Sequence, residues 1–460
     1  MNNQRIFNLL VLGFWFSLSL VFASDKQGSN LIGNGDFRGE IVNDLPAGWV
    51  IKSPRPSICP SFRVIEKKGE RCLYITGKGN PDCAGYIGAP VEIALGKTYR
   101  FHVLFRKSKD LNPIHHLLFD LATPNASYQI VEFHRLEDDW VEGEAILSFP
   151  GEGKIKAEAR IGYRLCAKEK IWIRNISFSE TEPVIPRWIR VACTQGPGRL
   201  EDYGLPVFRK ALDIAGKTKA DLVLLPEYMS GEGVQETITG PSAQLMSEKA
   251  GQYRMYVAGT IGLYDKEADR LSNAALLFNR EGKLIGRYDK IHLYGPELNQ
   301  EGVTPGDHVP VFQTDFGKVG FMTCSDSWFP DVAELVALKG ADILLFPNLG
   351  YDRALMHTRS LDNLINIITS TRSGQYGVWD PFGNDILARF KEGSVLPSVK
   401  NIVEVETEEK LGILIFDLNL SVPSGGGTRQ DAARSKRHVG NQRYFLEDEI
   451  KQEKERWWQD

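Results

Sequence analysis

From about residue 187 onwards, apolar runs of strand length alternate with apolar residues at helical spacing. Residues 318–323 form a short apolar run that predicts a buried strand, and residues 331–340 carry apolar side chains at helical spacing before a glycine. Residues 220–226 predict a second buried strand, and two alternating runs flank the turn at 279–282, which predicts a hairpin. We therefore expect an α/β domain over residues 187–428.

The preceding part of the chain has a different pattern. Short alternating runs are separated by turn residues, and no long helical period occurs between residues 30 and 182. The clearest runs cover residues 72–76, 98–105, 155–161 and 170–178. This pattern predicts an antiparallel β-sandwich over residues 24–182, joined to the α/β domain by the proline-bearing linker 181–186. A strongly charged extension, residues 429–460, follows the α/β domain.

Cys324 lies where the chain changes from strand to helix pattern. A cysteine on such a turn exposes its sulfur close to the free backbone N–H groups of a helix start, which favour a thiolate and a developing oxyanion. A structural cysteine more commonly sits inside a strand among aliphatic side chains. On this segment alone, a nucleophile and a structural thiol remain equally open.

Two charged residues follow other predicted strands. Glu227 comes just after the strand 220–226, at the end where α/β folds place chemistry. Lys290 follows the hairpin. Taken singly, each is more often a solvated loop charge.

Together, in the order Glu, Lys, Cys, these segments resemble the carbon–nitrogen hydrolase (nitrilase) superfamily. The resemblance covers about residues 187–427 in seven segments: 190–195, 224–228, 272–292, 304–307, 320–331, 359–363 and 380–388. It implies a four-layer α-β-β-α hydrolase domain, amidase-like, that uses no metal and no cofactor. No Cys or His spacing in the chain points to a metal site.

The resemblance also implies a reaction. Glu227 would take the proton of the Cys324 thiol, and Lys290 with the backbone N–H of Ser325 would hold the oxyanion. The family uses a second glutamate beside the lysine, for which Glu297 is our choice. Glu301 is the rival, and an ordinary loop carboxylate is the plain alternative for both.

This sequence departs from the family pattern after the nucleophile. An aromatic residue commonly follows the cysteine, whereas this chain has Ser325, so the size of the substrate pocket is open. The residues after the cysteine resemble amidase branches more than nitrilases, so we expect an amide rather than a nitrile substrate. By their placement beside the catalytic residues, we expect Tyr228, Ser325, Trp328 and Asn348 to line the pocket.

The N-terminus predicts the compartment. One basic residue, an apolar stretch and a small residue at position 23 are typical of a secretory signal peptide, residues 1–23, so we expect an exported protein. An uncleaved N-terminal membrane anchor is the alternative. Four cysteines in the β-sandwich region, Cys59, Cys72, Cys83 and Cys166, would allow two bridges in three connectivities or four reduced thiols.

Short motifs at both ends of the N-terminal domain, at 30–37 and 172–180, resemble galactose-binding-like jelly rolls of carbohydrate-binding modules. Trp49, Tyr86, Tyr128 and Trp140 are candidates for stacking on a sugar, although each is more often part of a core. A structural role for this domain is an equal alternative.

With 460 residues and a formal net charge of −4, the chain can hold two or three full cores and offers no electrostatic case for nucleic acid. We expect a homo-oligomer that hydrolyses a non-peptide C–N bond, in a carboxamide or carbamoyl group, through a cysteine thioester. A nitrile hydrolase with the same triad is one rival. A carbohydrate-binding protein with a silent hydrolase domain is the other.

Overall fold

The computed structural model describes residues 28–421, apart from 68, 131, 184, 197–203, 374–375 and 395–397. The predicted signal peptide (1–23) and the charged extension (429–460) lie outside the described residues. Among the described residues, no helix combines the length and the apolar character that crossing a membrane requires.

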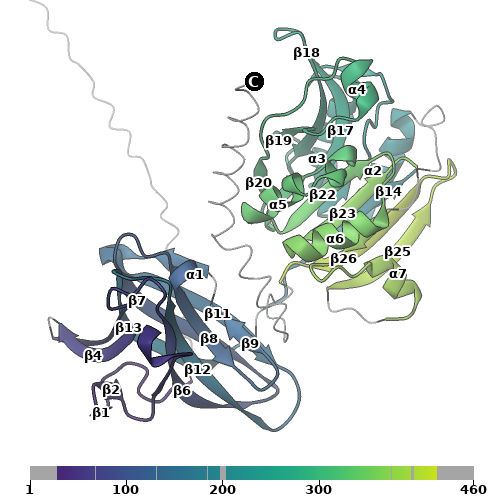
Figure 1. The fold of residues 1–460 in the computed structure, drawn as a ribbon. Coiled ribbons are helices and arrows are strands. Elements are labelled where there is room, and N and C mark those ends of the chain that lie inside the picture. The colour runs from purple at the N-terminus through teal and green to yellow at the C-terminus, as the bar shows by residue number, and fades with distance from the viewer. Residues whose placement is uncertain are drawn as a thin grey trace, which may run out of the picture.

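Two antiparallel sheets make up the N-terminal part of the structure (Figure 1). The six-stranded sheet has the order β10 (Glu132–Arg135), β11 (Val141–Phe149), β7 (Lys97–Lys107), β13 (Lys170–Thr181), β5 (Glu70–Thr76), β4 (Ser61–Lys67). The five-stranded sheet has the order β3 (Val50–Lys52), β6 (Ala84–Ala94), β12 (Lys154–Arg164), β8 (Leu117–Ala122), β9 (Ser127–Gln129). The predicted strands are therefore present, and a short helix α1 (Pro113–His116) and a hairpin, β1 (Ile41–Val42) with β2 (Leu45–Pro46), accompany them.

One hydrophobic cluster joins the two sheets. Alternate residues of β7, such as Phe101, Val103 and Phe105, and of β6, such as Ile87 and Ile93, belong to the same buried cluster. Because side chains alternate across a strand, each sheet contributes one apolar face to this core. The finer prediction, a jelly roll of the galactose-binding type, stays a prediction.

The aromatic residues proposed as sugar platforms are placed differently from one another. Trp49 is buried against Phe37 and donates its Nε1–H to the Gly33 carbonyl at 2.8 Å, so it belongs to the core. Tyr128 packs edge-on against Phe149. Tyr86 and Trp140 are partly exposed and lie beneath arginine guanidinium groups.

All six cysteines are free thiols in the structure. Cys83 and Cys166 lie together: the backbone N–H of Cys166 donates to Cys83 Sγ at 3.4 Å, and this sulfur lies 3.3 Å from the Cys166 carbonyl oxygen. Cys193 lies in the core of the C-terminal part, as its apolar strand predicts.

The C-terminal part is built on a mixed sheet. Its central order is β19 (Leu284–Asp289), β18 (Arg270–Phe278), β17 (Tyr256–Asp265), β15 (Leu222–Leu224), β14 (Trp188–Gln195), β23 (Asn366–Thr371), β22 (Ile343–Asn348), β21 (Lys318–Phe321), β20 (Val311–Gln313). Four further strands pair beside this path: β16 (Gln235–Glu236), β24 (Gly377–Trp379), β25 (Val399–Glu406) and β26 (Gly412–Asn419). The strands β15, β14, β23, β22 and β21 run parallel, so their carboxyl ends meet at one edge.

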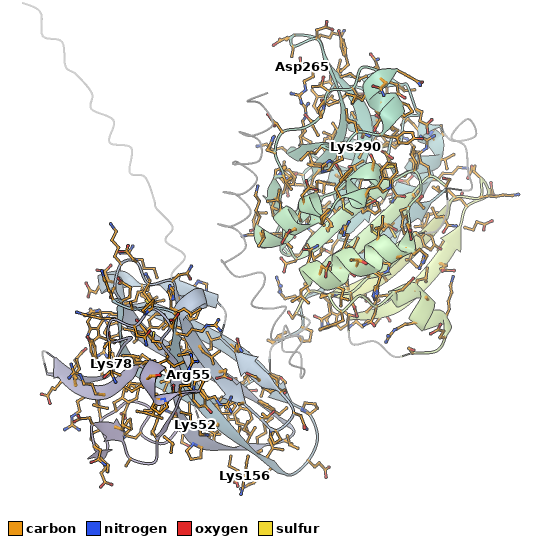
Figure 2. The ribbon with its side chains drawn as sticks, viewed as in Figure 1. Lys52, Arg55, Lys78, Lys156, Asp265 and Lys290 are labelled. Carbon is orange, nitrogen blue, oxygen red and sulfur yellow. The ribbon has the colours of Figure 1, made fainter. Side chains whose placement is uncertain are left out.

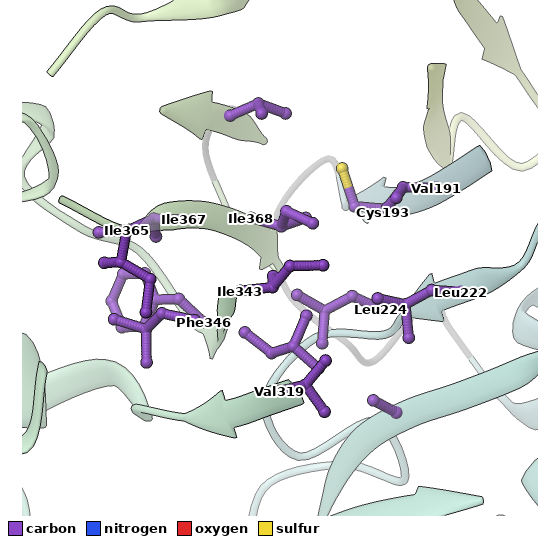
Figure 3. Packing of buried hydrophobic residues seen from close by; sticks show 14 of the residues in the cluster. Val191, Cys193, Leu222, Leu224, Val319, Ile343, Phe346, Ile365, Ile367 and Ile368 are labelled. Atoms are coloured by element: carbon purple, nitrogen blue, oxygen red, sulfur yellow. The ribbon is translucent and has the colours of Figure 1, made fainter. Parts of the chain in front are cut away.

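Helices cover both halves of this sheet (Figure 1). The helices α2 (Leu205–Lys217) and α3 (Pro241–Tyr253) share a core with β15 and β17, whereas α5 (Asp331–Leu338) and α6 (Arg353–Asn363) pack by β21, β22 and β23. Side chains of β14 and β15, among them Leu224, extend toward those of β21 and β22, among them Val319 and Ile343 (Figure 3). The two remaining helices are α4 (Gly295–Asn299) and α7 (Ile386–Lys391). Because the two halves of this one sheet share a core cluster and helices cover each half, the domain is an α/β sandwich.

Candidate active site

Cys324 lies between β21 and α5, at the carboxyl edge of the parallel strands. It begins a short 3₁₀ helix, Cys324–Trp328, and its φ of 43° lies in the left-handed region. A residue with a β-carbon rarely adopts this conformation, and such strain persists only where the surrounding structure holds it. The predicted strand-to-helix turn is present, and the cysteine on it is only partly buried.

Asp326 anchors this turn. Its Oδ2 accepts hydrogen bonds from the Thr323 backbone N–H at 2.9 Å and from the Tyr288 hydroxyl at 2.6 Å, and its Oδ1 accepts from the His292 backbone N–H at 2.8 Å. Ser325 adds a fourth link by donating its hydroxyl to the His292 carbonyl at 2.6 Å. The turn that carries Cys324 is therefore tied directly to the segment that follows Lys290.

Lys290 belongs to the C-terminal domain (Figure 2). Its side chain is almost completely buried and contacts two buried glutamates. Its Nζ donates to Glu227 Oε1 at 3.0 Å and to Glu297 Oε2 at 2.7 Å. Burial lowers the pKa of Lys290, but interactions with the negative charges of Glu227 and Glu297 outweigh it, so the pKa is raised. Lys290 is a fixed cation.

Glu297 is held by four donors. Besides Lys290, it accepts hydrogen bonds from Asn273 Nδ2 at 2.7 Å, from the Tyr228 hydroxyl at 2.8 Å and from the Tyr294 backbone N–H at 2.7 Å. Burial raises the pKa of this carboxyl, but Lys290 and the other donors outweigh burial and lower it. Glu297 is thus an anion whose oxygens are both occupied, which suits it to position Lys290 rather than to accept a proton.

Glu227 differs from Glu297 in having one free oxygen. Its Oε1 is bound by Lys290 and, at 2.8 Å, by Asn273 Nδ2, whereas its buried Oε2 has no hydrogen-bond partner in the described part of the chain. Burial raises the pKa of the Cys324 thiol, and the Glu227 charge raises it further, while Lys290 and the Leu349 backbone N–H act in the opposite direction. The thiol is therefore protonated at rest and lies beside a carboxylate.

The structure brings Glu227, Lys290, Cys324 and Glu297 into one cluster. Glu301 makes no hydrogen bond to Lys290 among the described contacts and is exposed, so the lysine-contacting position is held by Glu297. Burial, followed by the nearby charges of Glu297, Glu232 and Glu227, raises the pKa of Glu301. Glu301 is therefore exposed but lies close enough to the cluster for the charges of the cluster to raise its pKa.

The four residues expected to line the pocket differ in burial and in hydrogen bonding. The hydroxyl of Tyr228 is engaged with Glu297, and Ser325 and Asn348 are buried with their side chains donating to backbone carbonyl oxygens. Trp328 is 57% exposed and meets the ring of Tyr294 edge-on. The side chains of Tyr228, Ser325 and Asn348 are thus engaged in internal hydrogen bonds. Of the four residues, Trp328 is the one that exposes a large surface to solvent.

Sequence reasoning missed Asn273, Tyr288 and Asp326 as parts of the site. Asn273 bridges the two glutamates from β18, and Tyr288 reaches Asp326 from β19. The one signal for them was their place within the segments that carry the family resemblance. No group of three or more His, Cys, Asp or Glu residues that could hold a metal ion occurs in the described ranges.

Comparisons with known proteins show the family to which the chain belongs. The carbon–nitrogen hydrolase family model matches residues 190–421, half of the chain. The chain belongs to the carbon–nitrogen hydrolase family. A nitrilase of Pyrococcus abyssi is 32% identical over 247 residues, which cover 50% of this chain and 91% of that protein. The omega-amidase NIT3 of Saccharomyces cerevisiae is 27% identical over 215 residues, 40% of this chain and 74% of that protein.

Among solved structures, the crystal structure of Saccharomyces cerevisiae Nit3, a member of branch 10 of the nitrilase superfamily, is also similar. It is 23% identical with a TM-score of 0.43, and the match covers 53% of this chain and 94% of that one. The match of the family model shows that the C-terminal domain is a carbon–nitrogen hydrolase domain, and the matched region contains all four clustered residues.

Proposed function

We propose that this carbon–nitrogen hydrolase cleaves a carboxamide or carbamoyl group through a thioester on Cys324. The observation that carries the proposal is the Oε2 of Glu227, a buried carboxylate oxygen that has no hydrogen-bond partner in the described part of the chain. The charge of Glu227 acts on the Cys324 thiol nearby. A protonated thiol is a weak nucleophile, so a neighbouring base must remove its proton as it attacks.

In the first half of the reaction, Glu227 takes the thiol proton while Sγ adds to the amide carbonyl carbon. The negative charge that develops on the carbonyl oxygen is held by the Lys290 ammonium and by the backbone N–H of Ser325. Glu227 then gives its proton to the amide nitrogen, the C–N bond breaks, and ammonia or an amine leaves a thioester behind.

In the second half, water attacks the thioester with Glu227 again acting as the base. The products are the regenerated thiol and a carboxylic acid, or a carbamic acid when a carbamoyl group is cleaved, so no cofactor or redox partner is consumed. Glu297 stays charged throughout and holds Lys290 in place, because its oxygens are already bound by Lys290, Asn273, Tyr228 and Tyr294. In this mechanism Glu227 is the single base and Lys290 is the positioned cation.

Amides are favoured over nitriles because the residues after the nucleophile, Ser325 and Asp326, resemble the amidase branches of the family. Relatives with both kinds of printed name match the chain, a nitrilase and omega-amidases. We keep export, a homo-oligomeric state and a sugar site on the N-terminal domain as parts of the proposal. For the sugar site, Tyr86 and Trp140 are the partly exposed candidates.

The test is a screen of amides, ureas, carbamoyl compounds and nitriles with the wild-type protein and with Cys324→Ala as the matched control. Acid quenching followed by mass spectrometry is expected to show an acyl adduct on the peptide containing Cys324. Hydroxylamine should convert the acyl group to a hydroxamate. Turnover of nitriles without turnover of the matching amides would contradict the amide assignment, and turnover of any amide without the adduct would contradict the thioester.

A further inference from the structure

Arg372 lies at the carboxyl end of β23, beside the catalytic cluster. Its backbone N–H donates to the Asn348 carbonyl at 3.2 Å, at the end of β22. The next residue of that segment, Leu349, has the backbone N–H that lowers the pKa of the Cys324 thiol. Arg372 is therefore bound to the same short segment that contacts the proposed nucleophile.

The guanidinium of Arg372 is buried and only partly paired. Its side chain is 7% exposed, its Nη1 donates to Glu232 Oε1 at 3.2 Å, and its buried Nε has no hydrogen-bond partner among the described residues. Burial lowers the pKa of Arg372, and the charges of Glu232 and Glu227 act against that effect. The influence of Glu227 places the guanidinium within electrostatic reach of the proposed base.

A buried cation with an unused N–H is costly unless a ligand completes its hydrogen bonds. Lys290 already has two carboxylate partners, so its charge is satisfied inside the cluster. Arg372, by contrast, has a single contact with a carboxylate that is 60% exposed. A guanidinium presents a planar fork of donors that matches the two oxygens of a carboxylate.

We propose that Arg372 binds a carboxylate group of the substrate, and that Glu232 occupies this position in the free enzyme and is displaced when substrate binds. The proposal rests on the proposed amide hydrolysis and names the class of amide, one that carries a carboxylate at a distance from the reacting carbonyl. Glu232 can move away because it belongs to the loop between β15 and β16 and is largely in solvent.

The nearby carboxylates do not prevent such binding. Glu232 and Glu301 are exposed, so water and salt screen their repulsion of an anion, whereas the charge of buried Arg372 is screened far less. A purely structural Arg372–Glu232 ion pair is the competing explanation. The two explanations predict different effects of Glu232→Gln on anion affinity. If Glu232 competes with the substrate, its removal increases the affinity, whereas breaking a structural ion pair does not.

The experiment uses isosteric pairs of amides: succinamate with succinamide, and glutaramate with glutaramide. In each pair a carboxylate replaces a neutral carboxamide of nearly the same shape. The quantity compared is the ratio of kcat/KM for the anionic member to that for the neutral member. In parallel, calorimetry measures the binding of each compound to Cys324→Ala, which does not depend on turnover.

We expect Arg372→Gln to lower the anionic-to-neutral ratio roughly 10- to 100-fold, the effect of losing a hydrogen-bonded charge pair. Arg372→Lys should retain part of the preference because it keeps the charge without the fork. Glu232→Gln should raise the ratio. Arg359→Gln is the matched control, because Arg359 is also buried and its Nε also lacks a partner in the described ranges, but its Nη2 donates to the Ser327 carbonyl. The ratio for this variant should equal that of the wild type.

The proposal is wrong if Arg372→Gln changes both members of a pair equally, or if Cys324→Ala binds the anionic compounds no more tightly than the diamides. It is also wrong if Glu232→Gln weakens anion binding. If the anions bind through Arg372 but none of the amides is hydrolysed, the proposed function fails for these amides while the assignment of Arg372 stands.

Discussion

The Lys290 ammonium lies 2.7 Å from Oε2 of Glu297, and both side chains are almost completely buried. Such a pair is expensive to bury unless its remaining donors and acceptors are satisfied. Here they are, because Glu297 has three further donors and Lys290 also contacts Glu227. The pair therefore holds a cation at a constant position beside Cys324, which is what stabilising a transient oxyanion requires.

We expect Cys324→Ala to lower turnover by at least ~10³-fold, the usual effect of deleting a nucleophile, while fold and oligomeric state are retained. Steady-state kinetics, circular dichroism and light scattering check this. An alkylating agent should label Cys324 before Cys193, because Cys193 is fully buried in the core. If the alanine variant keeps most of its activity on a confirmed substrate, the thioester mechanism is wrong.

We expect Glu297→Gln to lower kcat by ~10²–10⁴-fold, because the amide cannot hold Lys290 with the same charge. Alkylation of Cys324 should persist in this variant. The matched control is Glu301→Gln, which removes a carboxylate that lies near the cluster but makes no hydrogen bond to Lys290 among the described contacts. A larger loss in Glu301→Gln than in Glu297→Gln would overturn the assignment of the second glutamate.

We expect Tyr228→Phe to lower kcat about 10-fold, because it removes a hydrogen bond of 2.8 Å from a buried hydroxyl to the charged Glu297, whose loss costs about 1.5 kcal/mol or more. Tyr264→Phe is the control, since it removes a hydroxyl bound to Asp269 at 2.7 Å at the exposed end of β17. Kinetics of the two variants on one amide provide the comparison. Equal rates in both would show that Tyr228 does not position Glu297.

The ion pair of His292 with Asp331 predicts a pH dependence of stability. The hydrogen bond to Asp331 raises the pKa of His292 above its ordinary 6.5, so this stabilisation is complete below 6.5 and is lost as pH rises through the raised pKa. Burial raises the pKa of Asp331, but His292 outweighs it and the pKa is lowered from 3.8. That contribution is present above 3.8 and is lost as pH falls through the lowered pKa.

Melting temperatures between pH 3 and 9 check this pair. Relative to His292→Gln, the wild type should gain most between the two ordinary pKa values and least at high pH. His308→Gln is the control, because His308 is 69% exposed and pairs with an exposed Asp307. A constant difference between wild type and His292→Gln at every pH would contradict the prediction.

The fold could be predicted from local patterns to a useful extent. Alternating runs predicted β5, β7, β12 and β13, and the run at 318–323 followed by helical spacing predicted β21 and α5, because periodicity reports directly which face of an element is buried. The partners of the strands could not be predicted in this way. The pairing of β14 with β26, more than 200 residues away, is decided by packing of the complete sheet.

For the site, the sequence by itself determined which residue types were present and in which order, so Glu227, Lys290 and Cys324 could be singled out from it. Only the tertiary structure decided that Glu297 rather than Glu301 contacts Lys290 and that Asn273 joins both glutamates. It also decided that Arg372 is buried, with an Nε that has no partner among the residues described. These relationships are distances between residues far apart in the chain. Such distances depend on how the carboxyl ends of parallel strands meet at one edge of the sheet, which no local pattern encodes.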